Sequence, residues 1–192
     1  MVRTIVALAA LMLATPTAAY AQWTLKPFAG VNFGSQHGFV DLDNAAGRVQ
    51  PTFGGAAGWE SSGAWGVEIE LATSPNFFKG DSGLIETGRV GTFFANANWR
   101  FGRANSRFQP YVTGGLGIAR ATIEDALGAF SSTSNLAALN LGSGVIAGTS
   151  TRLRLVADVR YVRSQYGDAR PAALGEEYVA FWRACGGVLL RF

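Results

Sequence analysis

Apolar and polar residues alternate along the C-terminal segment of this chain. One face would carry Tyr178, Ala180, Trp182, Ala184, Gly186, Val188, Leu190 and Phe192, and the other would carry Arg183, Cys185, Gly187 and Arg191. Successive side chains of a β-strand point to opposite faces, so a period of two predicts a strand with one apolar and one mixed polar face. The last strand of the chain therefore ends in an aromatic residue.

The same alternation divides the rest of the chain into about eight strand-like segments. We place them at roughly 23–34, 50–60, 64–73, 86–101, 108–122, 136–148, 151–162 and 177–192. The connections at 61–63, 102–107 and 148–150 are short, whereas those at about 35–49, 74–85, 123–135 and 163–176 are longer and rich in small and polar residues. Short turns at one end and long loops at the other predict an all-β fold, an antiparallel up-and-down barrel.

The apolar face of such a barrel has two interpretations. It meets lipid in a transmembrane barrel, and it lines a ligand cavity in a soluble lipocalin-like barrel. Aromatic residues near the short turns favour the first interpretation, because rings gather at both interfaces of a membrane. At the turn end they are Trp23, Trp59, Trp65, Trp99, Phe101 and Phe192, and at the other end Phe33, Phe53, Tyr161, Tyr178 and Trp182. The sequence therefore predicts a transmembrane β-barrel with an aromatic girdle.

The charged face would then line the lumen, since Arg or Lys facing mid-bilayer lipid costs about 2–4 kcal/mol. Buried charges need partners, and the interior of a barrel of this size is just filled by side chains. We predict a lumen plugged by ion pairs among Glu68, Glu70, Arg89, Arg100, Arg152, Arg154, Asp158, Arg160 and Arg183. Small residues on this face would leave room for them, at Gly54, Ala56, Gly58, Gly66, Gly115, Gly117, Gly142 and Gly144.

The N-terminus has the organisation of an export signal. Arg3 precedes an apolar stretch over 5–14, followed by Pro16 and the small-residue segment 19–21. This pattern predicts a secretory signal peptide over 1–21, cleaved before Gln22, and leaves 22–192 as one barrel domain. No later stretch is long and apolar enough for a transmembrane helix.

Composition and charge exclude several function classes. The formal net charge of the whole chain is +3, and the basic residues do not form runs, so nucleic-acid binding is not expected. The only cysteine, Cys185, has no partner for an internal disulfide and is far from the cleavage site of a lipoprotein. Asp41 and Asp43 with one His and one Cys do not form a metal-ligand set. We expect no cofactor.

Catalytic chemistry has little support. The only histidine, His37, lies beside Ser35 in a predicted loop without a supporting constellation. Glu68 and Glu70 share one strand face and could act as an acid/base pair, but pairing with arginines in the lumen is the favoured interpretation. The loop segment 77–79, Phe-Phe-Lys, could contact a surface partner or lipopolysaccharide.

Two motifs resemble a known family. Pro110 followed by 111–117, Tyr-Val-Thr-Gly-Gly-Leu-Gly, and the alternating segment that ends in Phe192 are similar to the small outer-membrane barrels of the outer membrane protein A type. The resemblance implies location in the outer membrane of a Gram-negative bacterium and an assembly signal at Val188, Leu190 and Phe192 that is read by the barrel assembly machinery. It does not extend to a peptidoglycan-binding domain.

We expect a monomer surrounded by membrane lipid and lipopolysaccharide, with a surface ligand bound through the loops as a further possibility. We expect a structural or surface-interaction role and no enzymatic activity. The alternatives are a narrow passive channel, a lipid A-modifying enzyme and a soluble lipocalin-like binder.

Overall fold

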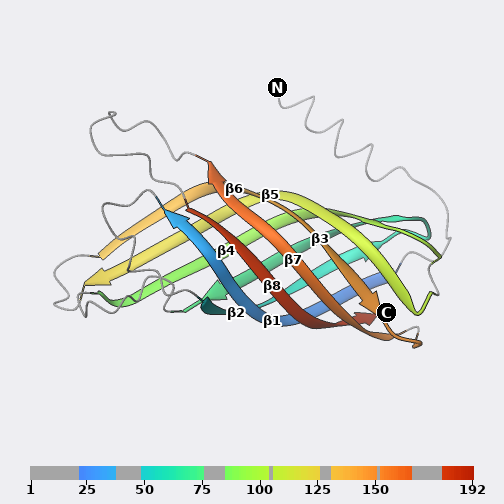
Figure 1. The fold of residues 1–192 in the computed structure, drawn as a ribbon. Coiled ribbons are helices and arrows are strands. Elements are labelled where there is room, and N and C mark those ends of the chain that lie inside the picture. Colours follow the sequence, from blue (N-terminus) through green and yellow to red (C-terminus); the bar gives the residue numbers. More distant parts are fainter. Residues whose placement is uncertain are drawn as a thin grey trace, which may run out of the picture.

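The computed structural model describes residues 22–37, 49–75, 85–103, 106–125, 131–150, 152–165 and 179–192. These residues form eight strands: β1 (Gln22–His37), β2 (Val49–Glu60), β3 (Trp65–Ser74), β4 (Ile85–Arg100), β5 (Phe108–Asp125), β6 (Ser131–Ala147), β7 (Leu153–Gln165) and β8 (Val179–Arg191). Each strand pairs with the next in antiparallel fashion, and β8 pairs back onto β1 to close the barrel (Figure 1). The predicted fold class and strand number are confirmed.

The two ends of the barrel differ as the sequence predicts. The described residues of the short turns, at 61–64, 101–103, 106–107, 148–150 and 152, lie together at one end, where the C-terminus also lies (Figure 1). Gly102 and Gly148 adopt positive φ values of 85° and 138°, a backbone conformation that residues with a Cβ rarely adopt. The Gly148 N–H donates a hydrogen bond to the Arg107 carbonyl at 2.9 Å, which ties two of these turns together.

The four predicted long loops are shorter than expected, most of all the one between β5 and β6. Strands β5 and β6 remain paired as far as Glu124 and Ser131, so only 126–130 separates them instead of 123–135. Strand β7 continues to Gln165, beyond its predicted end. The polar composition of these segments predicted loops, but backbone groups pair in a ladder whatever the side chains are. The loop residues themselves, 38–48, 76–84, 126–130 and 166–178, lie outside the described part of the chain.

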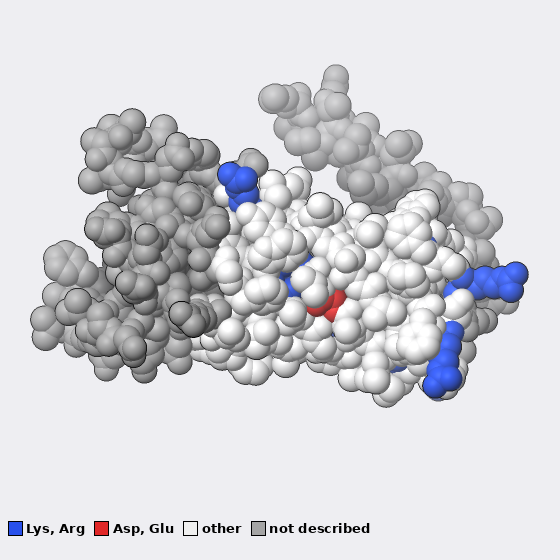
Figure 2. All heavy atoms as spheres, in the orientation of Figure 1, with Lys and Arg blue, Asp and Glu red and all other residues white. Residues whose placement is uncertain are grey.

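The outer surface of the barrel is apolar. Exposed large residues on it include Leu25, Val67, Ile69, Leu71, Leu116, Leu141, Leu155 and Val159. The face in Figure 2 is almost free of charged side chains. The exceptions are a small patch about midway along the barrel and Lys or Arg side chains towards its two ends. Polar residues instead point inward and are buried, which is the reverse of a soluble lipocalin-like barrel. That alternative is therefore wrong. No helix in the described ranges is long and apolar enough to cross a bilayer.

The turn-end aromatic residues lie on neighbouring strands. Trp23 is opposite Trp59 across β1 and β2, and Trp65 is opposite Trp99 across β3 and β4. The Trp59 and Trp65 rings are 5.0 Å apart between centroids. Trp23, Trp65, Trp99, Phe101 and Phe192 are exposed, while Trp59 is half-buried.

At the other end of the barrel, Trp182 on β8 is opposite both Phe33 on β1 and Tyr161 on β7. The rings of Tyr161 and Trp182 lie 5.2 Å apart between centroids. Phe53 on β2 is exposed on the outer face. Tyr178, which the sequence also assigns to this end, lies outside the described residues.

Glycines on the inner face make room for the interior side chains. A Cβ on Gly142 would lie 2.6 Å from Cγ of Arg160, and one on Gly144 would lie 2.7 Å from Cβ of Asp158. A Cβ on Gly115 would overlap the Asn96 side chain. Real Cβ atoms do not approach so closely, so the long polar side chains fit only because these positions lack a Cβ.

Candidate functional site

The lumen holds a cluster of buried charged side chains at its centre. Its members come from four strands between the first and the last of the barrel: Lys26 on β1, Glu68 and Glu70 on β3, Asp158 and Arg160 on β7, and Arg183 on β8. They point inward because each occupies an inner position of its strand's alternation. We call these six residues the lumen charge cluster.

Glu68 is held by two cations. Nζ of Lys26 lies 2.9 Å from Oε2 of Glu68, and Nη2 of Arg160 lies 3.1 Å from Oε1. The side-chain amide of Asn96 donates a further hydrogen bond to Oε1 at 3.3 Å. Both carboxylate oxygens of Glu68 therefore accept charge-assisted hydrogen bonds, which compensates for the loss of water around the buried charge.

Arg160 joins the three carboxylates of the cluster. Its Nη1 lies 2.8 Å from Oε2 of Glu70 and its Nη2 lies 3.1 Å from Oδ2 of Asp158, in addition to its contact with Glu68. Arg183 forms an ion pair with the other oxygen of Glu70. The exposed fractions of Arg160, Arg183 and Glu70 are 1% each. With three cations and three carboxylates the cluster is neutral.

Neutral polar groups complete the cluster. The Tyr111 hydroxyl on β5 donates to Oδ2 of Asp158 at 2.8 Å, and the Asn140 amide on β6 donates to Oδ1 of Asn96 at 2.7 Å. The guanidinium of Arg183 also lies 5.4 Å from the ring centroid of Phe28. Side chains from seven of the eight strands thus meet in one layer across the lumen.

The structure corrects the predicted membership of this cluster. Arg89 is exposed on the outer face, since it shares the strand alternation of Phe93 and Trp99. Arg152 is exposed in the turn before β7 begins. Neither belongs to the lumen. Lys26, which the sequence analysis did not assign to the ion pairs, contacts Glu68, and its inner position on β1 was the available signal.

Arg100 and Arg154 face the lumen but do not reach the cluster. Arg100 pairs with Glu60 at 2.7 Å and donates from Nη2 to three carbonyls of the 61–65 turn region. Arg154 donates to the Ser106 carbonyl and, at 3.5 Å, to Gln109. Both arginines therefore hold the short turns at the mouth of the barrel.

A second layer towards the loop end of the lumen is apolar on the side of β4 to β8, whereas Asn32, Thr52 and Ser74 are buried on the side of β1 to β3. This apolar layer is formed by buried residues of β4 to β8: Val90, Phe94, Ala119, Ala121, Leu136, Ala138, Val162, Val179 and Phe181. Phe94 is directly opposite Glu70 across β3 and β4, so this layer adjoins the charge cluster. The sequence analysis placed charged, polar and small residues inside the barrel and did not anticipate large apolar side chains there.

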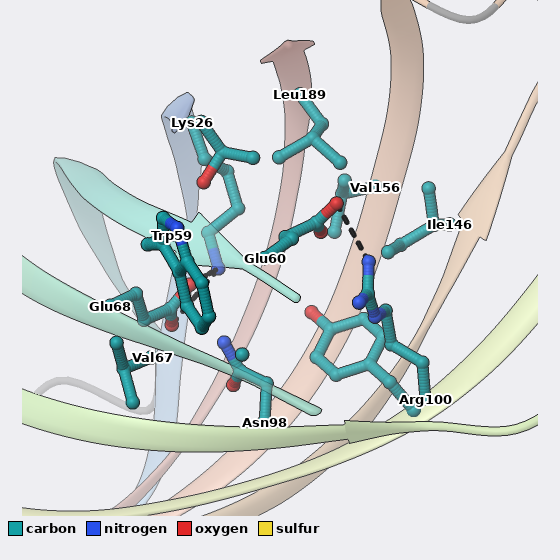
Figure 3. A pocket seen from close by; sticks show the side chains of 13 residues that line it. Lys26, Trp59, Glu60, Val67, Glu68, Asn98, Arg100, Ile146, Val156 and Leu189 are labelled. Carbon is teal, nitrogen blue, oxygen red and sulfur yellow. Dashed lines mark hydrogen bonds and ion pairs between the residues drawn. The ribbon is translucent and has the colours of Figure 1, made fainter. Parts of the chain in front are cut away.

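Below the cluster, towards the turn end, lies a small cavity of about 30 Å³. Lys26, Glu68, Asn98 and the Glu60–Arg100 ion pair line it (Figure 3). A cavity needs a volume of roughly 10–15 Å³ to hold one water molecule, so this cavity has room for about two. It is too small for a drug-sized ligand.

The geometry does not arrange the candidate catalytic residues for chemistry. Glu68 and Glu70 are both engaged in ion pairs, and the cavity that Glu68 lines has room for only about two water molecules. No group of three potential metal ligands occurs among the described residues. The backbone of His37 ends β1 opposite Val179, so its predicted loop position is corrected. Asp41, Asp43 and 77–79 lie outside the described part.

A closed antiparallel barrel with an apolar exterior and a charged interior defines the class of transmembrane β-barrels. The chain belongs to the outer membrane protein beta-barrel family, whose domain model matches residues 5–176. It is accordingly a protein of the Gram-negative outer membrane. No curated protein sequence matches the chain significantly.

Solved structures of small outer-membrane barrels share the fold. Neisserial surface protein A is 18% identical with a TM-score of 0.67, over 91% of this chain and 100% of that one. OprG from Pseudomonas aeruginosa is 18% identical with a TM-score of 0.58, over 91% and 96%. Ail from Yersinia pestis, in complex with the heparin analogue sucrose octasulfate, is 19% identical with a TM-score of 0.53, over 88% and 98%. At these identities the likeness concerns the fold.

Proposed function

We propose that this protein is a closed, non-conducting barrel that serves as a rigid outer-membrane scaffold for its surface loops. The observation that carries the proposal is the neutral charge cluster, in which side chains of seven strands meet across the lumen. The neutral charge cluster leaves no unpaired carboxylate or cation in its plane to attract an ion. On the loop side of the cluster, apolar side chains of β4 to β8 and the buried polar side chains Asn32, Thr52 and Ser74 of β1 to β3 occupy the lumen, and Asn32 donates to Ser74 at 2.6 Å.

Conductance in a planar bilayer tests the closed lumen. We expect no steady single-channel current from the purified protein. F94S places a polar side chain inside the lumen, because Phe94 belongs to the apolar layer, and V112S places one on the outer face of β5. The single-channel currents of the two variants are compared with that of the unmodified protein. A steady current from the unmodified protein would refute the scaffold proposal and establish the narrow passive channel.

The loops carry the proposed surface role. The eight strands form a closed barrel through their own backbone hydrogen bonds. This supports the expectation that the barrel keeps its fold when the loops are changed. Replacing 38–48, 76–84 or 166–178 by short Gly-Ser turns should preserve the heat-dependent shift in gel mobility that is typical of folded barrels. It should abolish any binding of the bacterium to host cells or matrix that depends on this protein. Binding that survives all three replacements would contradict the role of the loops.

Export and assembly complete the proposal. Residues 1–21 act as the signal peptide, so N-terminal sequencing of the membrane-inserted protein should begin at Gln22. Val188, Leu190 and Phe192 act as the signal for the assembly machinery, and the barrel is a monomer. A non-enzymatic role predicts identical lipid A mass spectra with and without expression; a modified lipid A would instead establish the enzyme.

A further inference from the structure

The polarity of the barrel wall reverses near the loop ends of three strands. Arg89 on β4, Arg120 on β5 and Arg163 on β7 point outward and are exposed. Their neighbours Val90 and Val162 point inward and are buried in the apolar layer. An apolar interior with a charged exterior is the pattern of a barrel wall in water. The reversal therefore marks the level at which the strands leave the hydrocarbon.

The spacing along β4 agrees with this level. Arg89 and Trp99 both face outward on that strand, and Trp99 belongs to the turn-end aromatic girdle. Ten positions at about 3.4 Å per residue, tilted by about 45°, correspond to roughly 24 Å along the membrane normal. The apolar band of such barrels is about 25 Å tall. Arg89 consequently lies at the interface opposite the turns, where the outer leaflet has its headgroups.

Arg89 and Arg120 are neighbours at this level. Arg89 is opposite Thr122, and Arg120 is opposite Gly91, so the two arginines are diagonal neighbours about 7–8 Å apart at their backbones. Asn135, also exposed, is directly opposite Arg120 on β6. The carboxylates of the lumen charge cluster and of Glu60 are engaged inside the barrel, and the acidic residue nearest in register, Glu124 on β5, is opposite Thr87, two positions further towards the loops. Two guanidinium groups on the same face repel each other, and an anion bound between them relieves this repulsion.

We propose that Arg89 and Arg120, together with Asn135, bind a phosphate of lipid A in the outer leaflet. This inference rests on the proposed orientation of the barrel, with its loops outside the cell. Lipid A is the lipid anchor of lipopolysaccharide and carries a phosphate at each end of its sugar backbone. The guanidinium fork matches phosphate oxygens, and the amide of Asn135 adds a neutral donor. Arg163, two strands further round, offers another cation at the same rim.

Lipid titration of the protein purified from outer membranes tests the site. Bisphosphorylated lipid A is added to the protein in neutral detergent, and the thermal unfolding midpoint is followed. If each arginine near a charged lipid surface contributes about 1 kcal/mol, R89Q/R120Q should need about thirtyfold more lipid A for half-saturation. The matched control R103Q/R152Q removes the same charge from exposed turn residues and should leave the titration unchanged. The single variants, each with about a fivefold effect, serve if the double variant does not fold.

Three results would overturn the proposal. These are equal binding of lipid A by R89Q/R120Q and the unmodified protein, equal binding of dephosphorylated lipid A, and equal competition by phosphatidylglycerol. The last would indicate an unspecific acidic lipid surface. Conductance measures the lumen and lipid titration measures the outer rim, so failure of this site is distinguishable from failure of the closed scaffold.

Discussion

Removing the guanidinium of Arg160 should destabilise the barrel more than any other single charge removal in the lumen. Arg160 is almost fully buried and contacts all three carboxylates of the cluster at 2.8–3.1 Å. In R160M the cluster would hold Glu68, Glu70 and Asp158 against only two cations. Removal of one partner from a buried ion pair typically costs about 3–5 kcal/mol, so the folded-to-unfolded ratio should fall by roughly 10²–10⁴.

The assay is urea unfolding of the protein refolded in lipid vesicles, followed by tryptophan fluorescence and by the gel-mobility shift. R163Q is the matched control, because Arg163 lies on the same strand but is exposed, and its unfolding free energy should change by less than about 0.5 kcal/mol. The double variant R160M/E70Q restores neutrality and should recover at least about 1 kcal/mol relative to additivity. A loss below about 1 kcal/mol for R160M, or strict additivity of the double variant, would refute the role of the cluster.

Three further predictions concern packing, assembly and the turns. G142A places a Cβ 2.5 Å from the Val159 carbonyl and should cost about 1–3 kcal/mol in urea unfolding, whereas G186A, with nothing within 4 Å, should cost under about 0.5 kcal/mol; equal costs would contradict the packing argument. F192A keeps the backbone hydrogen bond to the Trp23 carbonyl, so it should lower the amount of protein in outer-membrane fractions by immunoblot without changing refolded stability by more than about 1 kcal/mol; an unchanged amount would remove the assembly signal. R100Q loses charged hydrogen bonds to the first turn and should lower the free energy of unfolding by about 1.5–3 kcal/mol in the same assay. An unchanged free energy of unfolding would mean that the first turn does not depend on Arg100.

The alternation of apolar and polar residues predicted most of the fold. A period of two assigns each residue to an inner or outer face from local sequence alone, and Gly- and Ser-rich segments interrupt it at the turns. The same rule separates Arg89 from Asn96 and Arg100 within β4, because odd and even positions of one strand face opposite ways, so the prediction that Arg89 lies in the lumen departed from the rule and was wrong. Composition gave a wrong prediction where it was used in place of this rule. The polar segment at the β5–β6 connection was predicted to be a loop, but much of its backbone is paired in the ladder.

The contacts of the lumen were decided by the tertiary structure. Lys26 and Glu68 are 42 positions apart, and Arg183 and Glu70 are 113 apart, so their meeting depends on the register of every ladder between them and on closure of β8 against β1. A shift of one ladder by two residues would preserve every face assignment and yet change the ion-pair partners. The sequence by itself therefore determined that charged side chains such as Glu68, Glu70 and Arg160 enter the lumen, whereas the apolar side chains beside them became evident only in the structure. Only the closed barrel determined which of them meet, because register is a property of paired backbones and not of any single strand.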